Sequence, residues 1–254
     1  MRSVFFFLSC VLVLQGEIRE VSSFEPLQEI HDPNCLVLVD LDNCLMESTT
    51  CFGHGKWFEY HYQKMKEEGM EKEQIIASFY PRWVKSQRWV KVKFRDPKAK
   101  AIIETLQNQG IWVLGFTHRR GTVKFSTLRQ LQDLGLDFER GAPIKHELFL
   151  DYPHHPVYFG GVLFMNDYNE KGQVLTKFLK TIKYTPSSVV LIDDAESNVQ
   201  SVEEALEDLR IPFLGLHYPY DHEPYADYRI GDIQEFLIGK ILSDEAGETL
   251  LHRP

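Results

Sequence analysis

The sequence lacks several features that mark large classes of protein. Its 28 lysines and arginines face 37 aspartates and glutamates, a net charge of −9, so it has no basic surplus of the kind nucleic-acid-binding proteins carry. A few local cations can still attract a small phosphorylated molecule. Its 4 cysteines include no Cys-x-x-Cys pair, so nothing supports a zinc or thiol redox motif. Internal repeats and low-complexity segments are also missing, and 43% hydrophobic residues are typical of a globular chain.

The apolar run near the start is too short to span a bilayer comfortably. It extends over residues 4–14 after Arg2, which is the pattern of a secretory signal. Small residues allow cleavage after Gly16 or after Ser23, and the second fits slightly better. We therefore expect residues 1–23 to be a signal peptide and the protein to be periplasmic or secreted. An uncleaved membrane anchor is the alternative; otherwise no membrane span is expected in the mature form.

Three cysteines follow the expected signal, at positions 35, 44 and 51. An odd number in an exported chain leaves at least one thiol unpaired or paired between chains. Packing is the expected role of Cys35 and Cys44, whereas the role of Cys51 and the pairing of all three stay open.

Unbroken apolar runs predict three strands buried on both faces, at residues 36–39, 111–116 and 189–192. Helical segments separate them, which indicates an α/β fold with a parallel sheet and right-handed crossovers. The remaining expected elements are helices over 97–109, 122–134, from 171 and over 197–209, a hairpin over 158–165 and a strand at 212–216.

Residues 46–96 differ in character from the rest of the chain. They are rich in aromatic residues, and Trp57 and Tyr60, like Phe79 and Trp83, recur at helical spacing. We expect two or three helices here, inserted as a cap and contributing no strand to the main sheet. The expected division is then a core of residues 24–45 and 97–243, the cap at 46–96 and a frayed polar tail at 244–254.

Polar groups follow each of the three buried strands. Asp40 and Asp42 come after the first, Thr117 after the second, and Asp193 and Asp194 at the end of the third. Because the carboxyl ends of parallel strands share one edge of a sheet, these groups should converge. Four carboxylates in one place call for a divalent cation, and oxygen ligands favour magnesium over zinc or copper.

This order of motifs resembles the haloacid dehalogenase-like (HAD) superfamily of aspartate-nucleophile phosphohydrolases. The match consists of Asp-x-Asp after a hydrophobic strand, Thr after a second strand, a lysine, and an Asp-Asp pair, over about residues 36–218. The nearest likeness is to exported bacterial acid-phosphatase-like members, a branch of largely unknown function. The resemblance implies a three-layer, Rossmann-like core with a parallel sheet and a mainly helical cap after the first motif.

The resemblance also implies a role for each residue. Asp40 would be the nucleophile that forms an aspartyl-phosphate, and Asp42 the general acid and base, aided by the negative charge nearby. Thr117, with the amides after it and His118, would bind the phosphoryl group. Lys171 would hold both Asp40 and the phosphate. Magnesium would bind Asp40, Asp193, Asp194 and the Asp42 carbonyl.

Several residues keep more than one interpretation. Lys145 and Lys177 compete with Lys171 for the lysine role, although Lys177 lies on the expected solvated face of its helix. Arg119 and Arg120, like His118, could contact a second anionic group of a substrate or simply be solvated. Asn198 could hold the acidic loop or merely occupy the first turn of a helix.

The favoured function is therefore that of an exported magnesium-dependent phosphomonoesterase acting on a small phosphorylated substrate. The alternatives are a phosphotransferase and a weakly active or inactive binding or effector protein on the same fold. The sequence predicts neither the identity of the substrate nor the oligomeric state.

Overall fold

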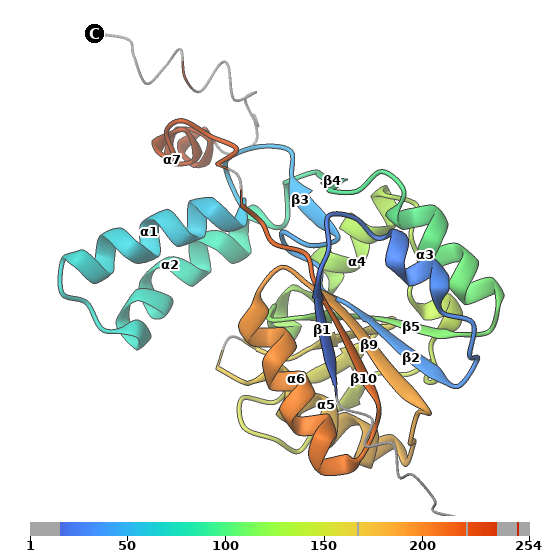
Figure 1. Cartoon of the computed structure of the whole chain (residues 1–254). Coiled ribbons are helices and arrows are strands. Elements are labelled where there is room, and N and C mark those ends of the chain that lie inside the picture. The colour runs from blue at the N-terminus through green and yellow to red at the C-terminus, as the bar shows by residue number, and fades with distance from the viewer. Residues whose placement is uncertain (1–15, 167, 222, 238–247, 249–254) are drawn as a thin grey trace, which may run out of the picture.

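The computed structural model describes residues 16–166, 168–221, 223–237 and 248, and its centre is an eight-stranded sheet (Figure 1). The strand order is β1-β10-β9-β2-β5-β8-β7-β6; neighbours from β1 to β8 are parallel, and β7 and β6 add an antiparallel edge. The strands are β1 (Glu17–Glu20), β2 (Cys35–Val39), β5 (Trp112–Thr117), β6 (Leu148–Phe149), β7 (Val157–Phe159), β8 (Val162–Phe164), β9 (Ser188–Asp193) and β10 (Phe213–His217).

Helices cover both faces of this sheet, which gives three layers. Val37 and Val39 of β2 pack in the cluster that includes residues of α3 (Ala99–Asn108) and α4 (Lys124–Asp133). Leu36 and Leu38 pack on the opposite face, with residues of α5 (Lys171–Ile182) and α6 (Glu196–Leu209). Because helices cover both faces of β2, all of its side chains are buried, and every position of this strand is apolar. The predicted α/β class and parallel three-layer core are confirmed.

The expected helices and strands of the core are present, with ends within two residues of the predicted ones. A short 3₁₀ turn (Gly121–Val123) precedes α4, and the predicted hairpin is the β7–β8 pair. Gly110 and Gly135, the predicted stops of two helices, have positive φ angles of 82° and 70°. Glycine adopts this left-handed conformation without the steric cost that a Cβ atom imposes.

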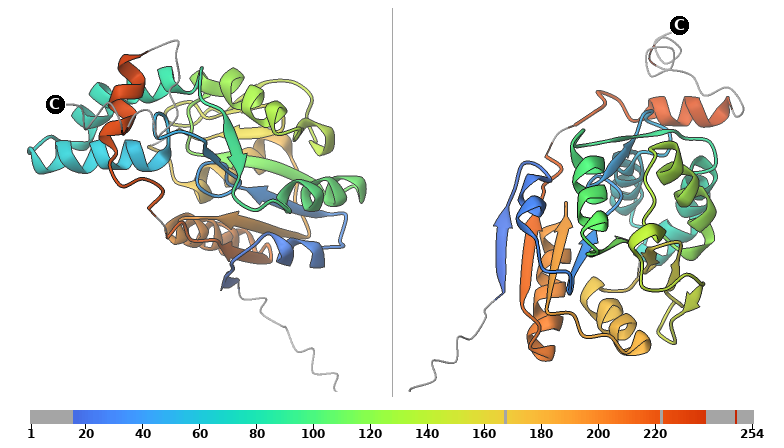
Figure 2. Two further views of the ribbon diagram at one scale, coloured as in Figure 1. Left: turned by 90° about the horizontal axis from the view of Figure 1, so that it is seen from above. Right: turned by 90° about the vertical axis from the view of Figure 1, so that its right-hand side faces the viewer.

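Residues 46–96 form a separate unit beside the sheet. Helices α1 (Gly55–Glu67) and α2 (Lys72–Ser86) lie side by side, away from the core (Figures 1 and 2). They are joined to it through a small antiparallel pair of strands that was not predicted, β3 (Met46–Ser48) and β4 (Val92–Phe94). Trp57 and Phe79 are fully buried between the helices, so these aromatics fill the core of this unit.

Helix α7 (Arg229–Phe236) comes from the residues expected to belong to the core, 97–243. It packs against α1 and α2 (Figure 1). Ile230 is buried among the cap aromatics, and Arg82 binds Asp232 at 2.8 Å and Glu235 at 2.6 Å. The unit that contains α1 and α2 is therefore completed by a distant segment of the chain.

The first strand of the sheet lies within the residues expected to form the signal peptide. Residues 17–20, assigned to a signal peptide ending at Ser23, form the edge strand β1 paired with β10. The pairing continues where the Val21 amide donates to the His217 carbonyl at 2.8 Å, and Phe24 is fully buried. Residues 1–15, which hold the apolar run, lie outside the described residues. So does nearly all of the expected frayed tail, of which Glu248 alone is described.

Cys35 and Cys44 are packed in the interior, as expected. Cys35 and Cys44 are buried thiols of the main core, and the Cys51 thiol is buried in the cap, near the Tyr228 carbonyl at 3.6 Å. Across the described ranges, none of the helices has the length and apolar character needed to cross a bilayer.

The contact between α7 and the cap can be tested by comparing two residues of the same helix. Ile230 is fully buried, whereas Phe236 is 87% exposed. We expect Ile230→Ala to lower the free energy of unfolding by about 2–4 kcal/mol, because it leaves a cavity in the small cap core. Phe236→Ala should change it by less than about 0.5 kcal/mol. Urea unfolding measures both values, and equal effects of the two substitutions would contradict the role given to α7.

Candidate active site

The three strands with polar ends are immediate neighbours in the sheet. In the β9-β2-β5 order, Val39 lies opposite Ile192 on one side and Gly115 on the other. The Asp40 amide continues the ladder by donating to the Ile192 carbonyl at 3.0 Å. The three predicted strand ends therefore meet at one carboxyl edge, where ligands bind in open α/β sheets.

Lys171 joins these strand ends directly. Its ammonium group donates to Asp40 Oδ1 at 2.6 Å, Asp193 Oδ2 at 2.6 Å and the Phe116 carbonyl at 2.7 Å. The side chain is fully buried, and all three of its donors are used. Lys171 thus binds the ends of three strands from the first turn of α5.

A close approach of two helices places Lys171 there. A Cβ atom on the next residue, Gly172, would lie 1.9 Å from the Ser201 carbonyl oxygen of α6. The Gly172 amide instead donates to Ser201 Oγ at 3.1 Å. Because only glycine allows this contact, it fixes where α5 begins and where the lysine enters the sheet edge.

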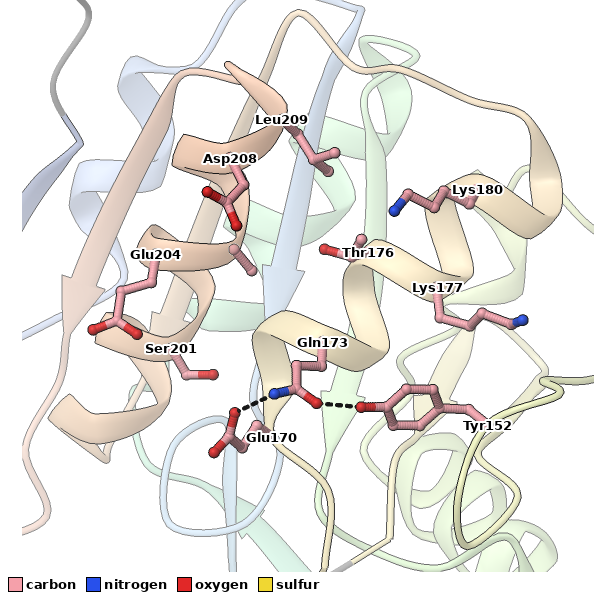
Figure 3. A pocket seen from close by; sticks show the side chains of 11 residues that line it. Tyr152, Glu170, Gln173, Thr176, Lys177, Lys180, Ser201, Glu204, Asp208 and Leu209 are labelled. Atoms are coloured by element: carbon pink, nitrogen blue, oxygen red, sulfur yellow. Dashed lines mark hydrogen bonds between the residues drawn. The ribbon is translucent and has the colours of Figure 1, made fainter.

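The two competing lysines lie elsewhere. Lys145 is exposed and donates to the Glu139 carbonyl. Lys177 comes from the outer side of α5 and lines a groove between α5 and α6 (Figure 3). Side chains of both charge signs line this groove, among them Glu170, Glu204 and Lys180 (Figure 3). Lys171 alone of the three contacts the strand-end carboxylates, and its catalytic role stays a prediction.

Three carboxylates form an acidic cluster around this lysine. Oxygens of Asp40, Asp193 and Asp194 lie within 4.8 Å of one another. Burial raises the pKa of Asp40 well above its ordinary value, with Lys171 opposing and the other two carboxylates adding to the rise. Burial, followed by the charge of Asp193, raises the pKa of Asp194 to about 7. Burial would lower the pKa of Lys171, but its two carboxylate partners raise it.

The chemistry of this cluster fits a hard divalent cation. Three carboxylates carry more negative charge than the ammonium group of Lys171 neutralises. Burial is the main cause of the raised pKa values of Asp40 and Asp194, and the neighbouring carboxylates add to it. The available donors are oxygens at the end of a buried sheet, the ligand type that magnesium binds. Asp40, Asp193 and Asp194 are thus the residues that would hold such an ion.

Thr117 and His118 lie at the same edge. Thr117 is buried, and its hydroxyl oxygen accepts a hydrogen bond from the Arg119 amide at 3.1 Å, which shapes the turn. A ring nitrogen of His118 lies 3.0 Å from Asn198 Oδ1, and the Asn198 amide group donates to Asp193 Oδ1 at 2.9 Å. Asn198 therefore holds the acidic loop, one of its two sequence interpretations.

Asp42 occupies a different environment from the one expected. Its carboxylate is not part of the acidic cluster but accepts two hydrogen bonds from Arg119, each 2.7 Å long. A guanidinium group, rather than a second anion, is therefore its neighbour. Arg119 was expected either to contact a substrate or to be solvated, but it is 3% exposed and its guanidinium pairs with Asp42. The assignment of the Asp42 backbone carbonyl to the metal stays a prediction.

Arg95 is a residue of the site region that sequence reasoning missed. Its guanidinium donates to the Asn43 carbonyl and to the carbonyls of Tyr218 at 3.3 Å and Pro219 at 3.1 Å. Asn43 has a φ angle of 59°, a conformation that asparagine tolerates better than most residues. Arg95 thus ties the turn after Asp42 to the end of β10. An isolated arginine gives no sequence signal for this contact.

A scan against family models matches residues 18–247 to the family described as "Protein of unknown function (DUF2608)". The match covers nearly the whole chain. The chain belongs to this family.

Curated relatives come from chlamydial species and are named, provisionally, as outer membrane proteins. One from Chlamydia trachomatis serovar D is 29% identical over 221 residues, covering 86% of this chain and 83% of the relative. One from Chlamydia pneumoniae is 27% identical over 248 residues, covering 97% and 92%. Their names state no reaction, so the roles of residues in this DUF2608 protein rest on its own geometry.

Solved structures with some similarity include HAD-like hydrolases and a class C acid phosphatase. A HAD-like family hydrolase from Porphyromonas gingivalis is 10% identical with a TM-score of 0.44, covering 81% of this chain and 98% of that one. The class C acid phosphatase from Bacillus anthracis is 14% identical with a TM-score of 0.36, covering 86% and 78%. Similarity this low carries no argument about activity.

The raised pKa of Asp194 predicts a pH dependence of stability. In the unfolded chain this carboxyl ionises near pH 4, but in the folded protein near pH 7. Between these values the folded state binds more protons, so the free energy of unfolding should fall as the pH rises from about 4 to 7. We expect wild type to lose on the order of 1–3 kcal/mol relative to Asp194→Asn over this range. Urea unfolding with a chelator present measures it; parallel curves for the two proteins would contradict the assignment.

Proposed function

We propose that this protein is an exported, magnesium-dependent phosphomonoester hydrolase that acts through an aspartyl-phosphate on Asp40. The observation that carries the proposal is the ion-paired group of Asp40, Lys171 and Asp193 at the carboxyl edge of the sheet. A nucleophilic carboxylate needs a cation that orients it and neutralises the incoming phosphate. Lys171 lies at hydrogen-bond distance from Asp40 and can therefore orient it.

In the first step, a carboxylate oxygen of Asp40 attacks phosphorus and the bond to the ester oxygen breaks. Lys171 holds Asp40 Oδ1, which leaves the second oxygen for the attack. Asp42 gives its proton to the departing alkoxide. In the second step, Asp42 takes a proton from water as the water attacks phosphorus, which releases phosphate and restores Asp40.

The polar groups of the second strand support the phosphoryl oxygens. Thr117 ends β5 beside Asp40, and the amides of the turn after it are the proposed donors, together with His118. Asp40, Asp193 and Asp194 would hold magnesium, which supplies positive charge to the phosphoryl group in the transition state. Asn198 and Lys171 keep Asp193 in place beside Asp40.

Export is part of the proposal and rests on the apolar run near the N-terminus. The provisional outer-membrane names of the chlamydial relatives are compatible with it. The division into a core and a cap over the site, and a small phosphorylated substrate, also belong to the proposal. A transfer of phosphate to an alcohol in place of water remains the nearest variant, and product analysis with added alcohol distinguishes the two.

Substitution of the proposed nucleophile tests the reaction. With magnesium present, Asp40→Asn should lower the rate of aryl phosphate hydrolysis at least about a thousandfold, because the amide cannot form the acyl-phosphate. Asp208→Asn, an exposed change on α6, is the control and should retain the wild-type rate. Equally slow phosphate release by wild type and Asp40→Asn removes the catalytic proposal.

Two lysines of one helix provide a matched test of the buried cation. Lys171→Met should lower the free energy of unfolding by about 3–5 kcal/mol and abolish hydrolysis, because it leaves Asp40 and Asp193 buried without their counterion. Lys177→Met, on the outer side of α5, should change stability by less than about 0.5 kcal/mol. Urea unfolding and the aryl phosphate assay are the measurements. A folded Lys171→Met protein with the wild-type rate is incompatible with the proposal.

A further inference from the structure

The pairing of Asp42 with Arg119 points to a control of the acid–base step by the cap. We propose that Arg119 is a positioning residue, held by Gln87 of the cap connection and Gln130 of α4, that fixes the orientation of the Asp42 carboxylate. This inference rests on the proposed function, in which Asp42 transfers the protons.

Arg119 holds Asp42 with a two-pronged ion pair. Its Nε donates to Asp42 Oδ2 and its Nη2 to Oδ1, both at 2.7 Å. Such a fork fixes both the position and the plane of a carboxylate, which a lysine cannot do. Each carboxylate oxygen keeps a second lone pair, so the oriented group can still pass a proton to an ester oxygen or accept one from water.

The remaining donors of Arg119 are all directed at the protein. Its Nη1 donates to Thr127 Oγ1 at 2.9 Å and to Gln130 Oε1 at 2.6 Å, and its Nη2 also reaches Gln87 Oε1 at 3.3 Å. With the two bonds to Asp42, the five N–H groups of the guanidinium are accounted for. Its orientation is therefore determined by its surroundings, which argues against a free substrate-binding cation.

Gln87 connects this arrangement to the cap. It caps the C-terminal end of α2, and its side chain is 1% exposed. Its Nε2 donates to the Gly53 carbonyl at 3.1 Å, and its Oε1 accepts a bond from Gln130 Nε2 at 3.0 Å. Gly53 lies in the connection before the cap helices and Gln87 in the connection after them. Gln87 therefore joins the two connections to each other and to Arg119.

The cap contributes a second contact to the same guanidinium. The Arg119 Cζ atom lies 5.4 Å from the ring centre of Trp83, one helical turn before Gln87 on α2. A displacement of α2 would therefore remove a cation–π contact and a hydrogen-bond acceptor from Arg119 together. Through Arg119, the position of the cap then determines whether Asp42 faces the leaving group in the correct orientation.

Leaving-group dependence separates this role from general damage to the protein. An aryl phosphate such as 4-nitrophenyl phosphate loses its leaving group without protonation, whereas an alkyl phosphate such as glycerol 2-phosphate needs a proton from the acid. We expect Gln87→Ala and Arg119→Lys to lower kcat for the alkyl ester at least about ten times more than for the aryl ester.

Gln234→Ala is the matched control for Gln87→Ala. Gln234 is also a buried glutamine of the cap, and its Oε1 accepts a bond from the Phe52 amide, next to Gly53. It should lower the rates for the two esters by the same factor. An equal effect of Gln87→Ala on both esters, or a higher rate with the alkyl ester, overturns the positioning role.

A stability measurement tests the same link without any activity. Gln87 and Asp42 are connected through Arg119, so Gln87→Ala and Asp42→Asn should have non-additive effects on the urea midpoint, with the double variant losing less than the sum. Additive effects overturn the inference. If wild type hydrolyses neither ester, the proposed function fails, and the double-variant comparison still decides the positioning role.

Discussion

The buried ammonium group of Lys171 is the interaction on which the site depends. It lies at hydrogen-bond distance from Asp40, Asp193 and the Phe116 carbonyl, and so joins the ends of β2, β9 and β5. A charge this deeply buried is tolerated only when its partners satisfy every donor. The close approach of Gly172 to α6 puts the lysine in place. One ammonium group does not balance the negative charge of the three carboxylates Asp40, Asp193 and Asp194, and the cluster therefore suits a divalent cation.

The cap and the core share more than a pair of connections. The chain leaves the last core strand and returns to the cap, where α7 buries Ile230 beside Trp57 and Phe79. On the other side, the Asp42–Arg119 pair extends into Gln87 at the end of α2. Polar, buried contacts of this kind have specific geometry, which is the basis of the proposed link between the cap and Asp42.

Much of the fold followed from local pattern. The apolar runs before Asp40, Thr117 and Asp193 predicted three buried parallel strands, because only strands covered on both faces are apolar throughout. Right-handed crossovers then place successive strand ends at one edge, so the meeting of these strand ends was predictable from their order. Which of the three candidate lysines joins them was decided by the close approach of Gly172 to α6. The cap helices were predictable from the spacing of their aromatics.

Other features were decided only by the tertiary structure. Strand β1 has the sequence Glu-Ile-Arg-Glu and lies mostly exposed at an edge, so its pairing with β10 leaves no apolar pattern to read. The attachment of α7 to the cap depends on contacts between segments about 150 positions apart. Arg119 and Asp42 are 77 positions apart, and neither sequence context predicts the pair, because Asp42 was expected beside other carboxylates and Arg119 on a substrate or in solvent. The sequence by itself determined which groups lie at the strand ends, because hydrophobic periodicity is a local property of the chain. The tertiary structure decided which charged groups pair with one another, because such pairs join residues that are far apart in the sequence.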